Sequence, residues 1–229
     1  MVAHRGCRAA KRVDAQMADQ QPPLRARELL ADGAIHFVGI ALGLAGAGAV
    51  VTLAVMNGRD GLASAIVYAA GLLAMLGCSA AYNVFHASGR REWLRRLDHA
   101  AIFAMIAGTY TPFTTRLASG WAAGLTAVIW AVAAAGIVLK LWQPRRIETM
   151  SVALYLALGW IGVVAAGPFL AAFEAPTLVL LAAGGIVYSA GVIFHLCRHL
   201  PYHNAIWHGF VLVAAGIHYV AVVEVIVDT

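Results

Sequence analysis

Charged side chains are scarce in this sequence. Of its 229 residues only 12% are Asp, Glu, Lys or Arg, whereas 62% are hydrophobic. A soluble domain normally carries about 25% charged residues, which help to form its hydrated surface. So few charges exclude an ordinary water-soluble fold, but they suit a protein whose outer surface faces lipid.

Cysteine is also rare. The chain has three cysteines, Cys7, Cys78 and Cys197, at wide spacing. Their odd number and their spacing exclude a disulfide framework and a Cys-x-x-Cys zinc motif. Cys78 and Cys197 lie inside apolar runs, so we interpret them as small packing residues.

The net charge of +5 does not indicate a nucleic-acid partner. Basic residues are spread over short segments between apolar runs and do not form one patch. A chain of this composition is expected to have membrane lipid as its partner and no nucleic acid.

Long apolar runs dominate what is present. Each has about the 17–25 residues needed to cross a hydrocarbon layer of about 30 Å. They lie near 34–56, 61–86, 98–115, 121–142, 150–170, 177–197 and 205–227, and the third is the shortest and most polar. The sequence therefore predicts an all-α integral membrane protein, a seven-transmembrane helix bundle formed by a single domain over residues 31–229.

Residues 1–30 are polar and basic, which predicts a disordered cytoplasmic tail, with Met17 as an alternative start. Nearly all lysines and arginines fall on the side of this tail, and only Arg59 and Arg116 lie on the other side. Because basic loops stay in the cytoplasm, we predict a cytoplasmic amino terminus and, after seven spans, an outside carboxyl terminus. The expected location is the cell membrane, as a multi-pass protein of the bacterial inner membrane.

Several polar side chains fall at one predicted membrane depth, near the cytoplasmic ends of the spans. Ionisable groups inside spans cost about 2.5–3.5 kcal/mol each on insertion scales and usually mark function. A metal or acid/base site is one interpretation. The other is that these histidines lie among lipid headgroups and that Asp98 favours a helix N-terminus. The residues are His36, Asn83, His86, Asp98, His99, His195, His203, Asn204 and His208.

Four segments resemble the hemolysin III branch of the progestin and adipoQ receptor family. They are ELLADGAIHFVG (28–39), SAAYN (79–83), RRLDHAAIFAMIAGTYTPF (95–113) and NAIWHGFVLVAAGIHYVAV (204–222), in the same order as in the family. The resemblance implies seven spans with the amino terminus inside and similarity to ceramidase-like hydrolases. It also implies a zinc ion near the cytoplasmic end, held by three histidines, with a span-three aspartate holding the zinc water.

Carried over to this chain, the resemblance implies Ser79 and Asp98 as catalytic residues and His208 as one zinc ligand. The other two ligand positions hold Asn83 and Asn204, and an amide oxygen is a poor zinc ligand. We therefore expect a degenerate zinc site with no cofactor, in which the two asparagines bridge directly or through water. His36 is a further candidate binding residue, if it turns inward.

Three functions stay open at this point. The favoured one is a lipid-binding or membrane-homeostasis protein that performs no metal-dependent hydrolysis, because the ligand set is incomplete. The second is a zinc-dependent hydrolase of a membrane lipid amide, with zinc bound by His208, His86 and Asp98. His86 follows Asn83 by three residues and so lies on nearly the same helix face. The third is a proton or ion pathway through Asp98, His208, His218 and Glu224.

Overall fold

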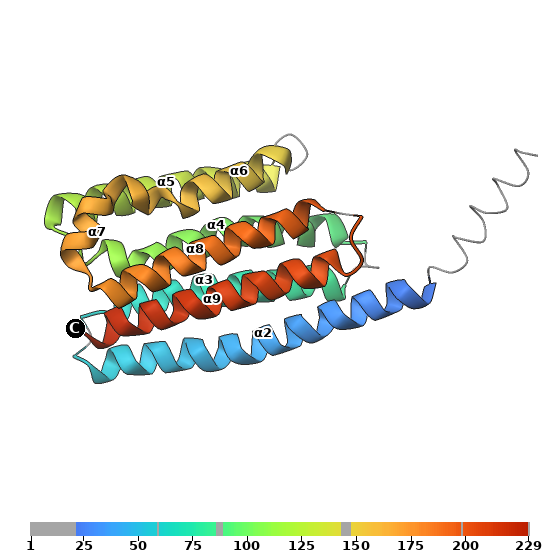
Figure 1. Ribbon diagram of the computed structural model, residues 1–229, viewed down its shortest axis with the longest axis horizontal. Helices are drawn as coiled ribbons and strands as arrows, with labels where there is room; N and C mark the ends of the chain where they lie inside the picture. Colours follow the sequence, from blue (N-terminus) through green and yellow to red (C-terminus); the bar gives the residue numbers. More distant parts are fainter. Residues whose placement is uncertain (1–21, 59, 86–88, 143–147, 198, 229) are drawn as a thin grey trace, which may run out of the picture.

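The structure is a computed structural model that describes residues 22–58, 60–85, 89–142, 148–197 and 199–228, and every regular element in this part of the chain is a helix. The helices are α2 (Pro22–Met56), α3 (Leu62–Val84), α4 (Arg91–Thr114), α5 (Ser119–Trp142), α6 (Glu148–Gly159), the 3₁₀ helix η1 (Ile161–Ala165), α7 (Ala166–Ala172), α8 (Ala175–Leu196) and α9 (His203–Val227). They run lengthwise as one bundle, with the carboxyl terminus at the end opposite to the beginning of α2 (Figure 1).

Six helical segments are long and apolar enough to cross a membrane. They correspond to six of the predicted spans, and the remaining predicted span, 98–115, is α4, which is less apolar. The architecture is that expected of an all-helical integral membrane protein. The six segments are Ala26–Met56, Leu62–Val84, Gly120–Trp142, Met150–Ala172, Ala175–Leu196 and His203–Val227.

Helix α2 begins at Pro22, well before residue 34, where the first span was expected. Residues 22–30 of the predicted tail are thus helical, and residues 1–21 lie outside the described part of the chain. Proline suits the first position of a helix, because its missing N–H would be unpaired there in any case. The segment that follows, RARELL, is rich in good helix formers. The longer helix places Asp32 and His36 one turn apart on α2.

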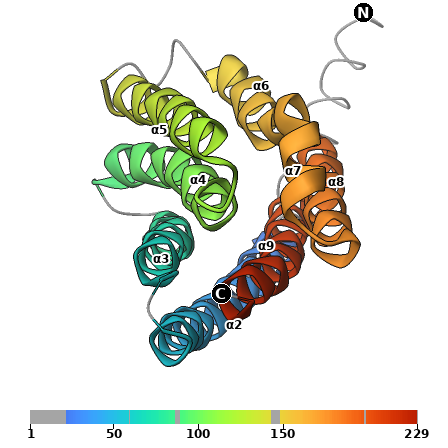
Figure 2. The same ribbon diagram turned by 90° about the vertical axis from the view of Figure 1, so that its left-hand side faces the viewer.

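Helix α4 owes its more polar sequence to its position between α3 and α5 and beside α9 (Figure 2). Phe103 and Phe113 of α4 are fully buried. Thr111 Oγ1 donates to the Ala107 carbonyl at 2.8 Å and accepts a hydrogen bond from Trp130 Nε1 of α5 at 3.1 Å. Because much of its surface faces protein, α4 needs fewer apolar side chains than a helix that faces lipid.

Two glycines allow α3 and α4 to pack closely. A Cβ atom on Gly71 would lie 3.1 Å from the Ala104 carbonyl oxygen, and one on Gly108 would lie 3.2 Å from that of Val67. Both neighbours are backbone atoms that cannot rotate away. Small residues at such crossings let helices approach each other in lipid.

The helix after α5 is interrupted where α6 ends at Gly159 and η1 begins. The Tyr110 hydroxyl of α4 reaches this break. It donates to the Gly159 carbonyl at 2.5 Å and accepts from the Gly162 N–H at 3.1 Å. Backbone groups without a partner are costly where water is absent, so the phenol stabilises the interruption.

We expect Tyr110→Phe to lower the free energy of unfolding by about 1–3 kcal/mol, because it leaves two backbone groups unpaired. Tyr68→Phe is the matched control. Tyr68 is fully buried, yet its hydroxyl has no hydrogen-bond partner among the described residues, so its removal should cost little. The measurement is SDS-induced unfolding of the purified chain in detergent micelles. Equal losses in both variants would contradict this role for Tyr110.

Candidate functional site

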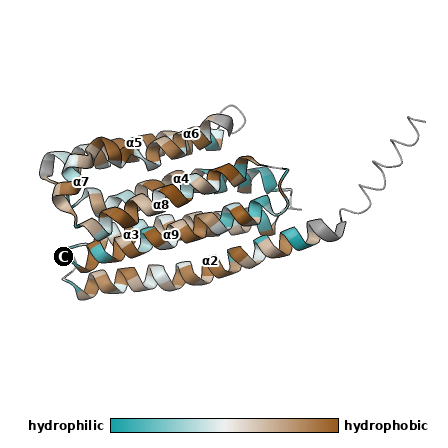
Figure 3. Ribbon diagram, in the orientation of Figure 1, coloured by the Kyte–Doolittle hydropathy of each residue, from teal (hydrophilic) through white to brown (hydrophobic). Residues whose placement is uncertain are grey.

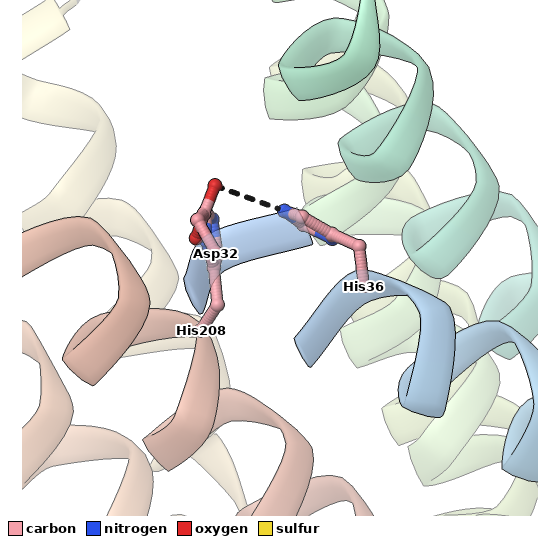
Figure 4. A group of neighbouring side chains, drawn as sticks. All are labelled: Asp32, His36 and His208. Carbon is pink, nitrogen blue, oxygen red and sulfur yellow. Dashed lines mark hydrogen bonds and ion pairs between the residues drawn. The ribbon is translucent and has the colours of Figure 1, made fainter. Parts of the chain in front are cut away.

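Hydrophilic residues gather at the end of the bundle where α2, α4 and α9 begin and α3 ends, which we call the polar end (Figure 3). Within it, Asp32 and His36 of α2 meet His208 of α9 (Figure 4). We call these three side chains the Asp–His cluster.

The Asp–His cluster shares one carboxylate between two imidazoles. His208 Nδ1 donates to Asp32 Oδ1 at 2.6 Å, and His36 Nε2 lies 3.5 Å from Asp32 Oδ2. The centroids of the two imidazole rings are 4.5 Å apart, with the planes tilted by 55°. Asp32 is 5% exposed and His36 7% exposed. Asp32 and His36 are therefore buried and His208 is half-buried, although the cluster lies near one end of the helices.

One face of α2 positions the beginning of α9. Glu28, Asp32 and His36 follow one another at four-residue spacing, which places them on the same side of the helix. Glu28 Oε1 accepts a hydrogen bond from the Tyr202 N–H at 3.0 Å. Tyr202 precedes the first residue of α9 and has a left-handed backbone, with φ of 60°. Glu28 thus contacts the residue just before α9, while Asp32 binds His208 in the second turn of α9.

Asp98 of α4 lies beside the Asp–His cluster. The Ser79 hydroxyl of α3 lies beside the Asp98 side chain, which is also close enough to His208, His36 and Asp32 to interact with them electrostatically. Four residues predicted as site residues, Ser79, Asp98, His36 and His208, are thus brought together from four different helices.

The two asparagines at the positions of the missing zinc ligands have other surroundings. Asn83 Nδ2 donates to the Ser79 carbonyl at 2.9 Å within α3, and the side chain of Asn204 is exposed. The bridge between Asn83 and Asn204 stays a prediction. His86 lies outside the described residues, so the alternative zinc set of His208, His86 and Asp98 stays a prediction as well.

The side chains of three further histidines face different partners. His99 Nδ1 lies 3.3 Å from the Nζ of Lys140, a fully buried lysine of α5. His195 packs against Trp207, with ring centroids 5.1 Å apart. His218 Nε2 lies 3.1 Å from the Leu181 carbonyl oxygen, deep in the bundle.

The first turns of α4, before the predicted span, are charged and solvated. Arg95 lies 3.0 Å and Arg96 3.6 Å from Glu92 Oε1. The hydrogen bond from Arg95 holds the pKa of Glu92 below its usual value. Exposed ion pairs of this kind contribute little to stability, but they mark a part of α4 that lies in a polar environment.

Sequence reasoning did not identify Asp32 as a site residue. It lies before residue 34, in the stretch that was expected to precede the first span. The four-residue spacing from His36 was the available signal, because it puts both side chains on one helix face. The contact with His208 spans 176 positions and leaves no trace in local sequence.

We expect Asp32 and His208 to be energetically coupled. In a double-mutant cycle of Asp32→Ala and His208→Ala, the coupling energy should reach about 0.5–3 kcal/mol, as for residues in one hydrogen-bonded network. Thr177→Ala supplies the control, since Thr177 bonds to Glu224 at the opposite end of the bundle. Its effect should add to that of Asp32→Ala within about 0.5 kcal/mol. SDS-induced unfolding measures all variants, and additivity between Asp32 and His208 would contradict the coupling.

Comparison with known proteins agrees with the architecture. The family described as "Haemolysin-III related" matches residues 26–219. The chain is 34% identical over 210 residues to "Hemolysin-3" of Bacillus cereus, covering 89% of this chain and 94% of that protein. It is 33% identical over 189 residues to "Hemolysin-3 homolog" of Bacillus subtilis (strain 168), covering 81% and 88%.

A more distant relative is human "Monocyte to macrophage differentiation factor", 27% identical over 179 residues, covering 69% of this chain and 68% of that protein. The match includes nearly all of α2 to α9 and confirms the resemblance to the hemolysin III branch of the progestin and adipoQ receptor family. The chain belongs to the haemolysin-III related family and is a multi-pass membrane protein.

Proposed function

We propose that this protein binds the headgroup of a membrane lipid at its polar end and serves membrane homeostasis without metal-dependent hydrolysis at the positions that the resemblance implies. One observation carries the proposal: the Asp98 side chain lies beside Ser79 and the Asp–His cluster, so that several ionisable groups gather at one place in the bundle. Ionisable groups cost about 2.5–3.5 kcal/mol each to insert into a membrane at mid-helix. A chain that retains several of them at one place is expected to use them.

The proposed topology puts this site at the cytoplasmic leaflet of the bacterial inner membrane. It has seven spans, with α4 as the third, the amino terminus inside and the carboxyl terminus outside. The positive residues of the tail and of the polar end support it. The charged Glu92–Arg95 segment at the start of α4 supports an interfacial position for the polar end.

The charges of the site favour a headgroup that donates hydrogen bonds. Asp98 is an acceptor when ionised, and a lipid ammonium or hydroxyl group can donate to it. Phosphatidylethanolamine, whose ammonium group carries three N–H donors, is the abundant bacterial lipid class that fits Asp98.

Two features support the loss of the zinc site that the resemblance implies. Asn83 is engaged with the Ser79 carbonyl, and Asn204 is exposed. Amide side chains are also poor zinc ligands compared with imidazoles. Neither position offers the imidazole nitrogen that a three-histidine zinc site requires.

Lipid retention tests this function. We expect the wild-type protein, purified from mixed phosphatidylethanolamine and phosphatidylglycerol nanodiscs, to retain phosphatidylethanolamine preferentially in native mass spectrometry. Asp98→Asn should weaken that retention about 10- to 100-fold, because a hydrogen bond to a charged group is worth about 1.5–3 kcal/mol. Glu224→Gln is the matched control, as it also neutralises a carboxylate but at the opposite end of the bundle. Equal retention by the wild type and Asp98→Asn would refute the proposal.

Reporter fusions test the topology. Green fluorescent protein should fluoresce when fused after residue 202 and stay dark when fused after residue 229, whereas alkaline phosphatase should show the reverse pattern. Both reporters read the side of the membrane, since the first folds in the cytoplasm and the second outside it. If α4 did not cross, every segment after it would change sides, and both fusions would give the inverted result.

The two other functions have weaker support. The amide hydrolase depends on His86, which lies outside the described residues. The proton or ion pathway depends on His218 and Glu224, whose described partners are the Leu181 carbonyl and Thr177. No contact among the described residues links these two side chains to Asp98.

A further inference from the structure

The Asp–His cluster has the arrangement of a metal site as well as that of a helix contact. One ligand atom from each of Asp32, His36 and His208 lies within 4.8 Å of the other two. Two of the side chains come from successive turns of α2, and the third comes from α9 (Figure 4). Ligands at four-residue spacing on one helix face can reach the same ion.

A second observation concerns His36. Its side chain is 7% exposed, and its Nε2 atom has no hydrogen-bond partner among the described residues. The closest acceptor, Asp32 Oδ2, is 3.5 Å away, which is too far for a good hydrogen bond. A buried nitrogen without a partner typically costs about 1–3 kcal/mol. This nitrogen faces the cluster, where its lone pair can be given to a cation.

One of the distances between ligand atoms already suits an ion with short bonds. Zinc binds imidazole nitrogen and carboxylate oxygen at about 2.0–2.2 Å, so neighbouring ligand atoms in a tetrahedral site are about 3.4 Å apart. The 3.5 Å between His36 Nε2 and Asp32 Oδ2 is close to that value. When the ion binds, it takes the place of the proton between His208 Nδ1 and Asp32 Oδ1, the proton is released to solvent, and the 2.6 Å between these two atoms widens.

We propose that Asp32, His36 and His208 bind one divalent transition-metal ion of the zinc class. Two imidazoles and one carboxylate are a known ligand set for zinc, and they leave a fourth position for water or another oxygen. These ligands differ from those that the resemblance implies. His208 is common to both sets, but Asp32 and His36 of α2 take the place of the ligands expected at positions 83 and 204.

The donor types also predict which ions bind. Magnesium and calcium prefer sites made of oxygen ligands, whereas imidazole nitrogen suits zinc. The cluster offers two nitrogens and a single carboxylate. Zinc should therefore bind in the presence of excess magnesium.

Metal analysis of the full-length chain tests the site. The protein is purified in mild detergent, stripped with a chelator, reloaded with ZnCl₂ in the presence of excess MgCl₂, desalted and measured by inductively coupled plasma mass spectrometry. We expect about one zinc ion per chain, as for a single three-ligand site. His36→Ala and Asp32→Asn should weaken zinc binding by more than about 100-fold, since loss of an outer-shell partner alone costs about 10- to 100-fold.

Asn83→Ala and Asn204→Ala are the matched controls, because they alter the positions implied by the resemblance and leave the cluster intact. Both should bind zinc as the wild type does. Zinc well below one ion per chain in the wild type would overturn the proposal, as would zinc kept by both cluster variants. Loss of zinc in Asn83→Ala with retention in His36→Ala would also overturn it, and would assign the metal to the other position.

A thermal measurement separates loss of the metal from loss of the fold. Zinc should raise the unfolding midpoint of the apo wild type, because a ligand that binds only the folded state stabilises it. The His36→Gln variant should show a midpoint close to that of the apo wild type and no increase with zinc. A zinc-dependent increase in this variant equal to that of the wild type would count against the site. Zinc binding and the unfolding midpoint are measured independently of lipid retention. Failure of the metal proposal can therefore be told apart from failure of the lipid proposal.

Discussion

Lipid offers no hydrogen bonds, and most of this structure follows from that constraint. A backbone inside the membrane must pair with itself, so the described chain is helical throughout its spans. Where one helix breaks, at Gly159, a tyrosine from α4 supplies both the donor and the acceptor that the backbone lacks. Thr111, a polar side chain inside the bundle, bonds both to its own helix and to a neighbouring one.

The same constraint gives the Asp–His cluster its importance. Helices α2 and α9 come from opposite ends of the chain and lie side by side (Figures 1 and 2). The contacts of Glu28 with Tyr202 and of Asp32 with His208 join them at the polar end. Because Asp32 is buried, competition with water weakens its hydrogen bond to His208 little. One face of α2 therefore both closes the bundle and supplies two of the three side chains of the cluster.

Membership of the haemolysin-III related family accounts for some residues of the site but not for all of them. Ser79, Asp98 and His208 match the residues that the resemblance implies, and they meet at the polar end. Two positions at which the resemblance implies histidines are asparagines here; Asn83 donates to the Ser79 carbonyl, and Asn204 is exposed. The three side chains of the Asp–His cluster lie on α2 and α9 instead. The lipid and metal proposals use different atoms of this region, Asp98 in one and the Asp–His cluster in the other.

The sequence by itself determined the class of the protein and the position of most helices. Length and hydropathy are local properties, and lipid requires them within each span. It also indicated Ser79, Asp98, His36 and His208. It placed the beginning of the first helix too late, because the RARELL segment is polar although it favours a helix. Only the tertiary structure decided that Asp32 belongs to the site, and that Asn204 is exposed while His36 is buried. Those facts depend on how α2 packs against α9, and packing between residues 176 positions apart is not encoded in any local pattern.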